Sequence, residues 1–139
     1  MKIKILDIPP QGLEFTSLVP PSFLGVGFDL EGAFLGPLRF TALVHKTADQ
    51  VTGEAQLAGE LATRCSRCLT EVTLPWNVSF SVDISYQRHD ESVDLTPDVR
   101  DEMILGLPVK ILCVDACRGL CAGCGVNLNI KSCKCQCKE

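Results

Sequence analysis

The sequence predicts a small α+β protein with a curved antiparallel sheet or partial β-barrel, one helix and a cysteine-rich C-terminal tail. Apolar residues that alternate with polar ones predict the strands, and one capped amphipathic stretch predicts the helix. Seven of the nine cysteines lie within residues 113–139 and mark the tail. We therefore expect a β-rich body over residues 1–112 and a tail, packed on that body, over residues 113–139.

The N-terminal quarter of the chain predicts little regular structure before the first hairpin. Residues 1–25 contain proline and glycine turns without a sustained period, so we expect an arm with one short strand at its start. Phe28 and Leu30 then alternate with acidic residues, and Gly36-Pro37 predicts the turn of a hairpin. The returning strand places Leu38, Phe40, Ala42 and Val44 on one face.

Two longer strands are predicted after this hairpin. The first runs up to Arg64-Cys65. The second has the strongest alternation in the chain, with eight apolar residues at every second position from Val72 to Tyr86. We expect it to bend at Pro75, which lacks the N–H that a ladder needs. In the strand that runs up to Arg64-Cys65, the apolar positions are Val51, Ala55, Leu57 and Leu61.

One helix is predicted over about residues 97–107. Thr96 is suited to cap it, Pro97 to occupy its first turn, and Asp98 to interact favourably with the positive end of the helix dipole. Gly106 and Pro108 end it. The expected buried face consists of Val99, Met103, Ile104 and Leu107.

Charge and hydropathy restrict the class of protein. No apolar run approaches the roughly 18–20 residues of a membrane helix, and the N-terminus has no apolar core of a signal peptide, so we expect a cytoplasmic protein without a membrane partner. The net charge of −4 is unlike that of a general nucleic-acid binder. The charge is nevertheless uneven, with −6 over residues 1–112 and +2 over residues 113–139.

Two C-x2-C pairs are typical of zinc sites. Cys65 and Cys68 lie between two expected strands, whereas Cys121 and Cys124 lie in the tail beside glycines that ease the turn of the backbone toward sulfur. The tail is too dense in cysteine to have much of an apolar core. Because the cytosol is reducing, we favour metal ligation over disulfides.

The cysteine count fits either one closed four-cysteine site with further thiols or two sites with one cysteine left over. We favour two zinc sites, because one would hold the tail to the sheet and the other would fold the tail locally. In a simpler alternative, Cys65 and Cys68 are reduced, partly buried thiols. The expected ligands are Cys65, Cys68, Cys113 and Cys117 in one site and Cys121, Cys124, Cys133 and Cys135 in the other, with Cys137 unassigned.

Catalytic interpretations fit the pattern less well. A thioredoxin-type motif places its cysteine at a helix N-terminus within a βαβ unit, whereas Cys65 is flanked by expected strands. An open catalytic zinc site usually has histidine or carboxylate ligands, but His45 and His89 are far from the cysteines in sequence. The sequence has no nucleophile motif, phosphate-binding loop or dinucleotide fingerprint. We expect neither an enzyme nor a small-molecule substrate.

The cysteine-rich segments together resemble one known family. The segments that carry the likeness are 64–69 (RCSRCL), 107–108 (LP), 117–125 (CRGLCAGCG), 127–129 (NLN) and 133–135 (CKC). Across roughly residues 60–135 they are similar to the YceD-like family of large ribosomal RNA subunit accumulation proteins. The resemblance implies a bacterial or plastid protein that supports accumulation of large-subunit ribosomal RNA, and hence ribosome assembly. Cys137 and the proline-rich arm depart from the family pattern.

Basic residues gather near the cysteines, and six of the thirteen lie within two positions of one. They could contact RNA, or they could balance the formal −2 charge of a zinc ion with four thiolates. Two functions stay open: a non-enzymatic zinc-binding factor that acts with large-subunit ribosomal RNA or an assembly-associated protein, and a zinc/thiol redox-responsive regulator. The candidate contact residues are Arg64, Arg67, Arg118, Lys131 and Lys134.

Overall fold

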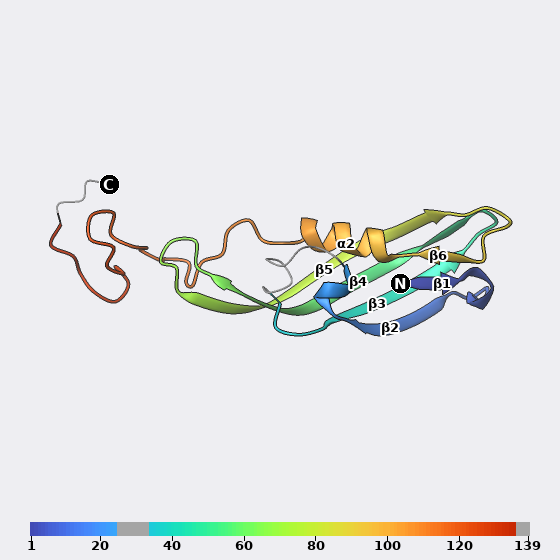
Figure 1. Cartoon of the computed structure of the whole chain (residues 1–139), viewed down its shortest axis with the longest axis horizontal. Coiled ribbons are helices and arrows are strands. Elements are labelled where there is room, and N and C mark those ends of the chain that lie inside the picture. Colours follow the sequence, from blue (N-terminus) through green and yellow to red (C-terminus); the bar gives the residue numbers. More distant parts are fainter. Residues whose placement is uncertain (25–33, 136–139) are drawn as a thin grey trace. The chain divides into compact units, whose positions relative to one another are not determined.

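Four long strands pair into one antiparallel sheet (Figure 1). The structure is a computed structural model and describes residues 1–24 and 34–135. The strand order is β2-β3-β4-β5, and a second sheet pairs β1 with β6. The strands are β1 (Lys2–Lys4), β2 (Leu13–Val19), β3 (Leu38–Lys46), β4 (Gln50–Arg64), β5 (Glu71–Ser85) and β6 (Ser92–Asp94), and the helices are α2 (Thr96–Leu105) and the short 3-10 helices η1 (Ile5–Asp7) and η2 (Pro21–Leu24).

Contacts within the chain define two compact units that are interleaved in sequence. Unit 1 comprises Met1–Leu61 and Pro75–Leu107. Unit 2 comprises Ala62–Leu74 and Pro108–Glu139, so it joins the end of the β4–β5 hairpin to the cysteine-rich segment. The domain boundary expected at residue 112, and the packing of the tail on the body, stay predictions.

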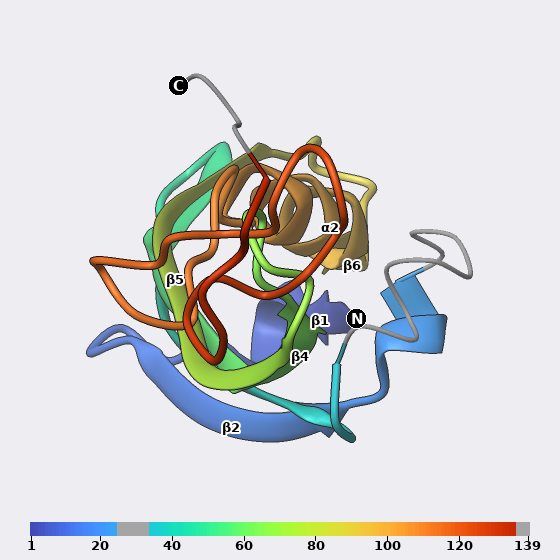
Figure 2. The ribbon, with the colours of Figure 1, turned by 90° about the vertical axis from the view of Figure 1, so that its left-hand side faces the viewer.

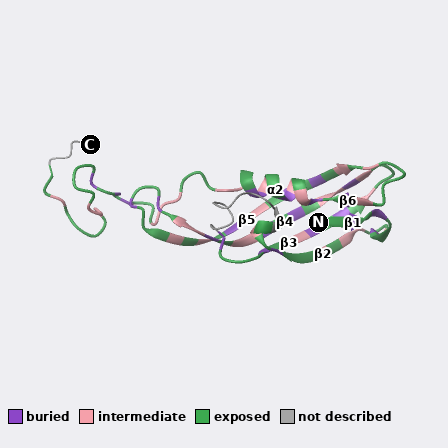
Figure 3. Cartoon of the chain, in the orientation of Figure 1, coloured by how far each residue is buried: buried purple, intermediate pink, exposed green. Residues whose placement is uncertain are grey.

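Unit 1 has an aliphatic and aromatic core. Buried residues alternate with more exposed ones along β3 (Figure 3). Phe40 and Val44 are buried, whereas Arg39 and His45 are exposed. In Figure 2 the sheet curves around α2 and the β1–β6 pair. The four-stranded sheet stays open, with β2 and β5 as its edges, so the curved-sheet form of the prediction is correct and the described strands do not close into a barrel.

The three predicted strands after Pro37 are confirmed as β3, β4 and β5, each within two residues of its expected bounds. The ring of Trp76 on β5 meets that of Phe34 edge to face, with centroids 5.1 Å apart, and its Nε1–H donates to the Gly106 carbonyl at 2.9 Å. These contacts fix the buried face of β5. The strand expected around Phe28 and Leu30 lies outside the described residues.

The N-terminal arm contains more structure than the sequence predicted. β2 pairs with β3 along seven residues, from Leu13 opposite Val44 to Val19 opposite Leu38. Of the seven β2 residues only Val19 is buried, because this strand lies at the sheet edge and presents most of its length to solvent. An edge strand with one buried side chain has no sustained apolar period, which explains why the prediction missed it.

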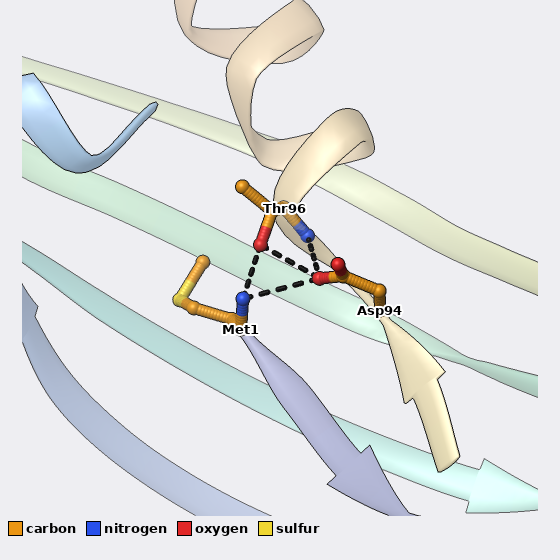
Figure 4. A network of polar contacts seen from close by, with 3 residues as sticks. All are labelled: Met1, Asp94 and Thr96. Carbon is orange, nitrogen blue, oxygen red and sulfur yellow. Dashed lines mark hydrogen bonds and ion pairs between the residues drawn. The ribbon is translucent and has the colours of Figure 1, made fainter. Parts of the chain in front are cut away.

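The start of α2 also differs from the prediction. Thr96 is the first helical residue rather than the cap, and the carboxylate of Asp94 accepts its backbone N–H at 3.0 Å. The α-amino group of Met1 donates to the same Asp94 oxygen at 3.1 Å and also contacts the Thr96 hydroxyl (Figure 4).

The buried face of α2 is narrower than predicted. Val99 and Met103 are fully buried, whereas Ile104 is 42% exposed and Leu107 lies beyond the helix end. Gly106 follows the last helical residue, Leu105, and donates its N–H to the Glu102 carbonyl at 2.9 Å, so the helix ends about two residues before the predicted residue 107. In the described part of the chain, no helix has the length and hydropathy of a membrane span.

Candidate metal centres

Unit 2 brings eight cysteines together in two groups of four. Cluster 1 consists of Cys65, Cys68, Cys113 and Cys117, and cluster 2 consists of Cys121, Cys124, Cys133 and Cys135. Within each cluster the Sγ atoms all lie within 4.8 Å of one another. The sequence predicted this membership. Cys137 lies outside the described residues.

The C-x2-C pair of each cluster lies in a backbone turn of the same type. In cluster 1 the Arg67 N–H points at the Cys65 sulfur at 3.5 Å, and the Leu69 N–H donates to the Cys65 carbonyl at 3.0 Å. In cluster 2 the corresponding bonds run from Gly123 to the Cys121 sulfur at 3.4 Å and from Gly125 to the Cys121 carbonyl at 2.9 Å. Backbone amides aimed at sulfur stabilise a thiolate, as metal ligation requires.

Both turns need a positive φ at the residue that follows the second cysteine. Gly125 meets this need with φ 70° at no steric cost, whereas Leu69 adopts φ 60° with its side chain 57% exposed. A non-glycine residue in this region is strained. The positive φ of Leu69 therefore indicates that the other contacts of the turn hold its backbone conformation in spite of this strain.

Cluster 1 joins two distant parts of the sequence within unit 2. The Ser66 N–H donates to the Ile111 carbonyl at 2.7 Å, and the Ile111 N–H donates back to the Ser66 hydroxyl at 3.2 Å. The Arg67 guanidinium donates to the Cys117 carbonyl at 2.8 Å. These bonds place Cys113 and Cys117 beside the Cys65–Cys68 turn.

Two polar side chains that the sequence reasoning did not assign to the site also contact cluster 1 sulfurs. The Cys68 Sγ and Thr70 Oγ1 atoms form a hydrogen bond of 3.2 Å, and the Asn129 side-chain amide donates to the Cys117 Sγ at 3.3 Å. Thr70 lies two residues after Cys68, but Asn129 is separated from Cys117 by the first pair of cluster 2. Only the pattern Asn127-x-Asn129, which is typical of side chains that bond nearby backbone, could have drawn attention to it.

Cysteine sulfur makes up the buried core of unit 2. In the described part of this unit, the buried hydrophobic side chains are all cysteines: Cys65, Cys68, Cys117 and Cys121. The aliphatic side chains packed on cluster 1, Val72 and Leu112, are only partly buried. Apolar burial therefore contributes little to the folding of this unit.

The sulfur spacing fits a tetrahedral ion. Four thiolates about 2.3 Å from Zn²⁺ would lie about 3.8 Å from one another. The Cys65–Cys117 and Cys68–Cys113 sulfurs of cluster 1 are 3.7 and 3.5 Å apart, and the Cys121–Cys133 sulfurs of cluster 2 are 3.2 Å apart. These separations are far longer than the roughly 2.05 Å of a disulfide bond. The donor set and its geometry therefore fit a closed four-cysteine zinc site in each cluster.

The proton affinities of the cluster 1 thiols diverge. Hydrogen bonds from the backbone amides of Cys68 and Arg67 lower the pKa of Cys65 to about 6. Hydrogen bonding from Thr70 likewise lowers the pKa of Cys68. The hydrogen bond with Cys68, followed by burial, raises the pKa of Cys113 to about 12. Cys65 and Cys68 thus ionise readily, while the hydrogen bond with Cys68 and burial favour the protonated form of Cys113.

In cluster 2, contacts between neighbouring sulfurs also raise the pKa of thiols. Contact with the Cys121 sulfur raises the pKa of Cys133, and contact with the Cys124 sulfur, and then with that of Cys133, raises the pKa of Cys135 to about 12. A divalent cation among the four sulfurs removes the repulsion between thiolates and displaces the remaining protons. Such a site binds metal more tightly as pH rises.

The five predicted contact residues all lie in unit 2, and all are exposed. Arg64 ends β4, while Lys131 and Lys134 lie in the segment between Asn127 and Cys135. Arg67 also donates to the Cys117 carbonyl, and the backbone N–H of Arg118 donates to the Asn129 side chain at 2.8 Å. Their side chains therefore remain available to a partner, with Arg67 also serving the structure of cluster 1.

Comparisons with known proteins converge on one family. Residues 82–139 match the family model described as "Large ribosomal RNA subunit accumulation protein YceD". The chain is 35% identical over 49 residues to "Large ribosomal RNA subunit accumulation protein YCED homolog 1, chloroplastic" of Arabidopsis thaliana, and 39% identical over 49 residues to the protein of that name from Zea mays. Each alignment covers 35% of this chain, but only 15% and 16% of the respective plant protein.

A bacterial relative aligns over more of the chain. "Uncharacterized protein YlbN" of Bacillus subtilis (strain 168) is 25% identical over 119 residues, which cover 77% of this chain and 69% of that protein. No solved structure gives a significant match. The match to the family model includes Cys113 to Cys135, and so contains six of the eight clustered cysteines. Through this C-terminal region, the chain is similar to the YceD family.

Proposed function

We propose that this protein is a non-enzymatic zinc-binding factor of the cytoplasm that supports accumulation of large-subunit ribosomal RNA, and with it ribosome assembly. The observation that carries the proposal is the all-cysteine buried core of unit 2, of which Cys117 and Cys121 lie in the region that matches the accumulation-protein family. Zinc ligation turns this segment into a folded surface. The family likeness supplies the ribosomal context.

Both proposed zinc sites are structural. Four cysteines per cluster complete the tetrahedral shell of zinc, which leaves no position for water or substrate. Cluster 1 is largely buried, with Cys65, Cys68 and Cys117 among the least exposed residues of unit 2. A closed, buried site of this kind stabilises a fold and does not activate a nucleophile.

The two units differ strongly in charge. Unit 2 contains seven of the thirteen basic residues and three of the seventeen acidic ones, which gives it a formal charge of +4 against −8 for unit 1. Two zinc ions with eight thiolates add a formal −4 to unit 2. The loaded unit is therefore close to neutral, and RNA contact depends on where its side chains lie rather than on its total charge. We assign this contact to Arg64, Arg67, Arg118, Lys131 and Lys134.

Alanine replacement of these five residues tests the RNA contact. We expect large-subunit ribosomal RNA to accumulate less while zinc content stays at the wild-type level. If they meet phosphates, the slope of log affinity against log salt should flatten by roughly 0.7–0.9 for each phosphate that is no longer neutralised. Because Arg67 also bonds the Cys117 carbonyl, a second variant keeps Arg67 and changes only the other four.

A matched control removes five exposed charges from unit 1 instead. Its alanine replacements are at Lys2, Lys4, Arg39, Arg88 and Arg100. We expect this control to leave RNA accumulation unchanged. Normal accumulation in the unit 2 variant, or an equal loss in the control, would contradict the RNA contact and would favour an assembly-associated protein as partner.

Exposed sulfur in cluster 2 favours a second candidate function, a zinc/thiol redox-responsive regulator. Cys124 and Cys135 are exposed, whereas three of the four cluster 1 cysteines are buried. Exposed thiolates are the ones that oxidants reach first. If this function holds, mild peroxide should release zinc from cluster 2 well before cluster 1, and a thiol reductant should restore binding. Retention of both ions under these conditions would exclude it.

A further inference from the structure

A small hairpin of unit 2 carries cluster 2 ligands at its tip and Asn129 at its base. Leu120 bridges to Asn127, and the Leu128 N–H donates to the Gly119 carbonyl at 2.9 Å. The Cys121 N–H donates to the Val126 carbonyl at 2.9 Å, which closes the turn that contains Cys124. The chain thus leaves cluster 1 at Cys117, passes through the first pair of cluster 2 and returns to cluster 1 at Asn129.

The Asn129 side chain is held in one orientation. Its Oδ1 accepts the Arg118 N–H at 2.8 Å, so its Nδ2 is the atom that faces the Cys117 sulfur, at 3.3 Å. Asn127 fixes the amide further, because its Oδ1 accepts both the Asn129 N–H at 3.0 Å and the Asn129 Nδ2–H at 2.9 Å. Asn129 therefore presents a fixed hydrogen-bond donor to a cluster 1 sulfur.

A donor in this place strengthens a zinc–thiolate site. A zinc ion with four thiolates carries a formal −2 charge, and a hydrogen bond to one sulfur disperses part of it. Partners that bond metal ligands from outside the first coordination shell typically change metal affinity by about 10–100-fold. The Asn129 amide is such a partner for Cys117.

The hairpin needs cluster 2 to hold Asn129 in place. Isolated two-stranded hairpins are marginally stable in water. In this hairpin, Cys121 is the one described hydrophobic residue that is buried. An ion in cluster 2 would tie Cys121 and Cys124 to Cys133 and Cys135, which lie beyond Asn129 in the sequence. Filling cluster 2 would therefore close the chain around Asn129 from both sides.

We propose that Asn129 is a positioning residue through which metal binding at cluster 2 strengthens metal binding at cluster 1. The proposal rests on the zinc sites proposed above. Because coupling between two sites is reciprocal, an occupied cluster 1 also strengthens binding at cluster 2. The pair of sites then fills cooperatively, and unit 2 passes from unfolded to fully loaded with few half-loaded chains.

Substitutions at Asn129 separate its two hydrogen bonds. Asn129→Asp keeps the acceptor for the Arg118 N–H but loses the donor to Cys117, whereas Asn129→Ala loses both. If the donor matters, both variants should lower the zinc affinity of cluster 1 about 10-fold or more. A role limited to holding the Arg118 backbone predicts that Asn129→Asp behaves like the wild type. Ile130→Ala, at an adjacent residue with 76% exposure, is the matched control and should change nothing.

A double-mutant cycle tests the coupling on the full chain. Cluster 2 is disabled by the paired change Cys124→Ser and Cys135→Ser, with and without Asn129→Asp. The affinity of cluster 1 is measured with Co²⁺, through the sulfur-to-cobalt charge-transfer band, and with Zn²⁺ by chelator competition. We expect disabling cluster 2 to weaken cluster 1 about 10-fold in the wild-type background and less than 2-fold when Asn129 is already Asp.

The outcomes distinguish this proposal from the function on which it rests. Equal weakening in both backgrounds, or none in either, would overturn the role of Asn129 while two bound ions would still support the zinc sites. A wild-type chain that binds no metal would refute the zinc sites themselves. Hydrogen exchange over residues 111–130 of the metal-loaded chain shows whether unit 2 of each variant is folded. If Asn129→Asp lowers this protection, the charge-transfer band of the Co²⁺-loaded Asn129→Ala chain is compared with that of Ile130→Ala. A shifted band supports the donor to the Cys117 sulfur, and an unchanged band overturns it.

Discussion

Removing zinc from the purified protein should unfold unit 2 and leave unit 1 folded. Unit 2 contains about 45 residues, close to the size of about 40 below which domains usually need metals or disulfides. In zinc-finger peptides a structural zinc site contributes about 10–16 kcal/mol at pH 7, whereas full burial of one Val or Leu side chain contributes about 1.5–3 kcal/mol. Val72 and Leu112 pack against cluster 1 only partly buried. Together they cannot replace even one zinc ion.

Unit 1 has a core that does not involve the cysteines. Phe40, Leu57 and Met103 are fully buried in it, as are several other aliphatic side chains of β3, β4 and α2. This core should persist after the metal has been removed. The expected pattern is therefore a loss of order confined to residues 62–74 and 108–135.

Hydrogen exchange with a strong zinc chelator measures this pattern. Peptides from residues 111–130 should lose their protection, while those of β3 should keep it. Addition of zinc should restore protection, which controls for irreversible damage. If residues 111–130 keep their protection in the metal-free protein, the reasoning from the all-cysteine core is wrong.

Single residues give three further predictions. The Thr96 hydroxyl and N–H bond Asp94 and lower its pKa to about 2, below its ordinary 3.8, so its contribution to unit 1 stability should be complete above about pH 4 and lost as pH falls toward 2. In urea unfolding, the free energy of unfolding of Asp94→Asn should be at most about 1 kcal/mol below that of the wild type near neutral pH, because this carboxylate is 43% exposed. Near pH 2 the two free energies should be equal. Leu69→Gly should hold zinc in cluster 1 at least as well as the wild type under chelator competition. Leu69→Val should hold it less well, because a β-branched residue tolerates φ 60° poorly. The reverse order of zinc affinities would contradict backbone strain at Leu69. Phe40→Ala should lower the free energy of unfolding of unit 1 by about 3–5 kcal/mol in urea, while the native variant keeps its zinc. Loss of zinc before denaturant is added would contradict the claim that units 1 and 2 have separate cores.

The parts of the fold that sequence could predict are those with a local signal. β5 has one buried face over fifteen residues, and its alternation identifies it without any other information. The cysteine groups were predictable because C-x2-C spacing restricts which sulfurs share an ion. The residues of β5, and the two cysteines of each C-x2-C pair, are close together in the chain, although cluster 1 also joins Cys65 and Cys68 to the distant Cys113 and Cys117.

The parts that were missed depend on distant partners. β1 is the short strand expected at the start of the arm, but its pairing with β6 some ninety residues later, with Ile3 opposite Val93, was not predicted. β2 is defined by its pairing with β3 rather than by its own pattern. Asp94, and not Thr96, accepts the first helical N–H, and the α-amino group of the distant Met1 contacts the same carboxylate oxygen. Asn129 reaches Cys117 only because the intervening hairpin folds back.

The most direct test of the account is the metal content of the intact protein, measured by native mass spectrometry together with a count of reactive thiols. We predict two zinc ions per chain, with the eight cysteines of clusters 1 and 2 protected from alkylation until a chelator is added. One zinc ion, with Cys65 and Cys68 freely alkylated, would contradict the assignment of cluster 1. A metal-free chain that holds its fold through disulfides would contradict the account as a whole.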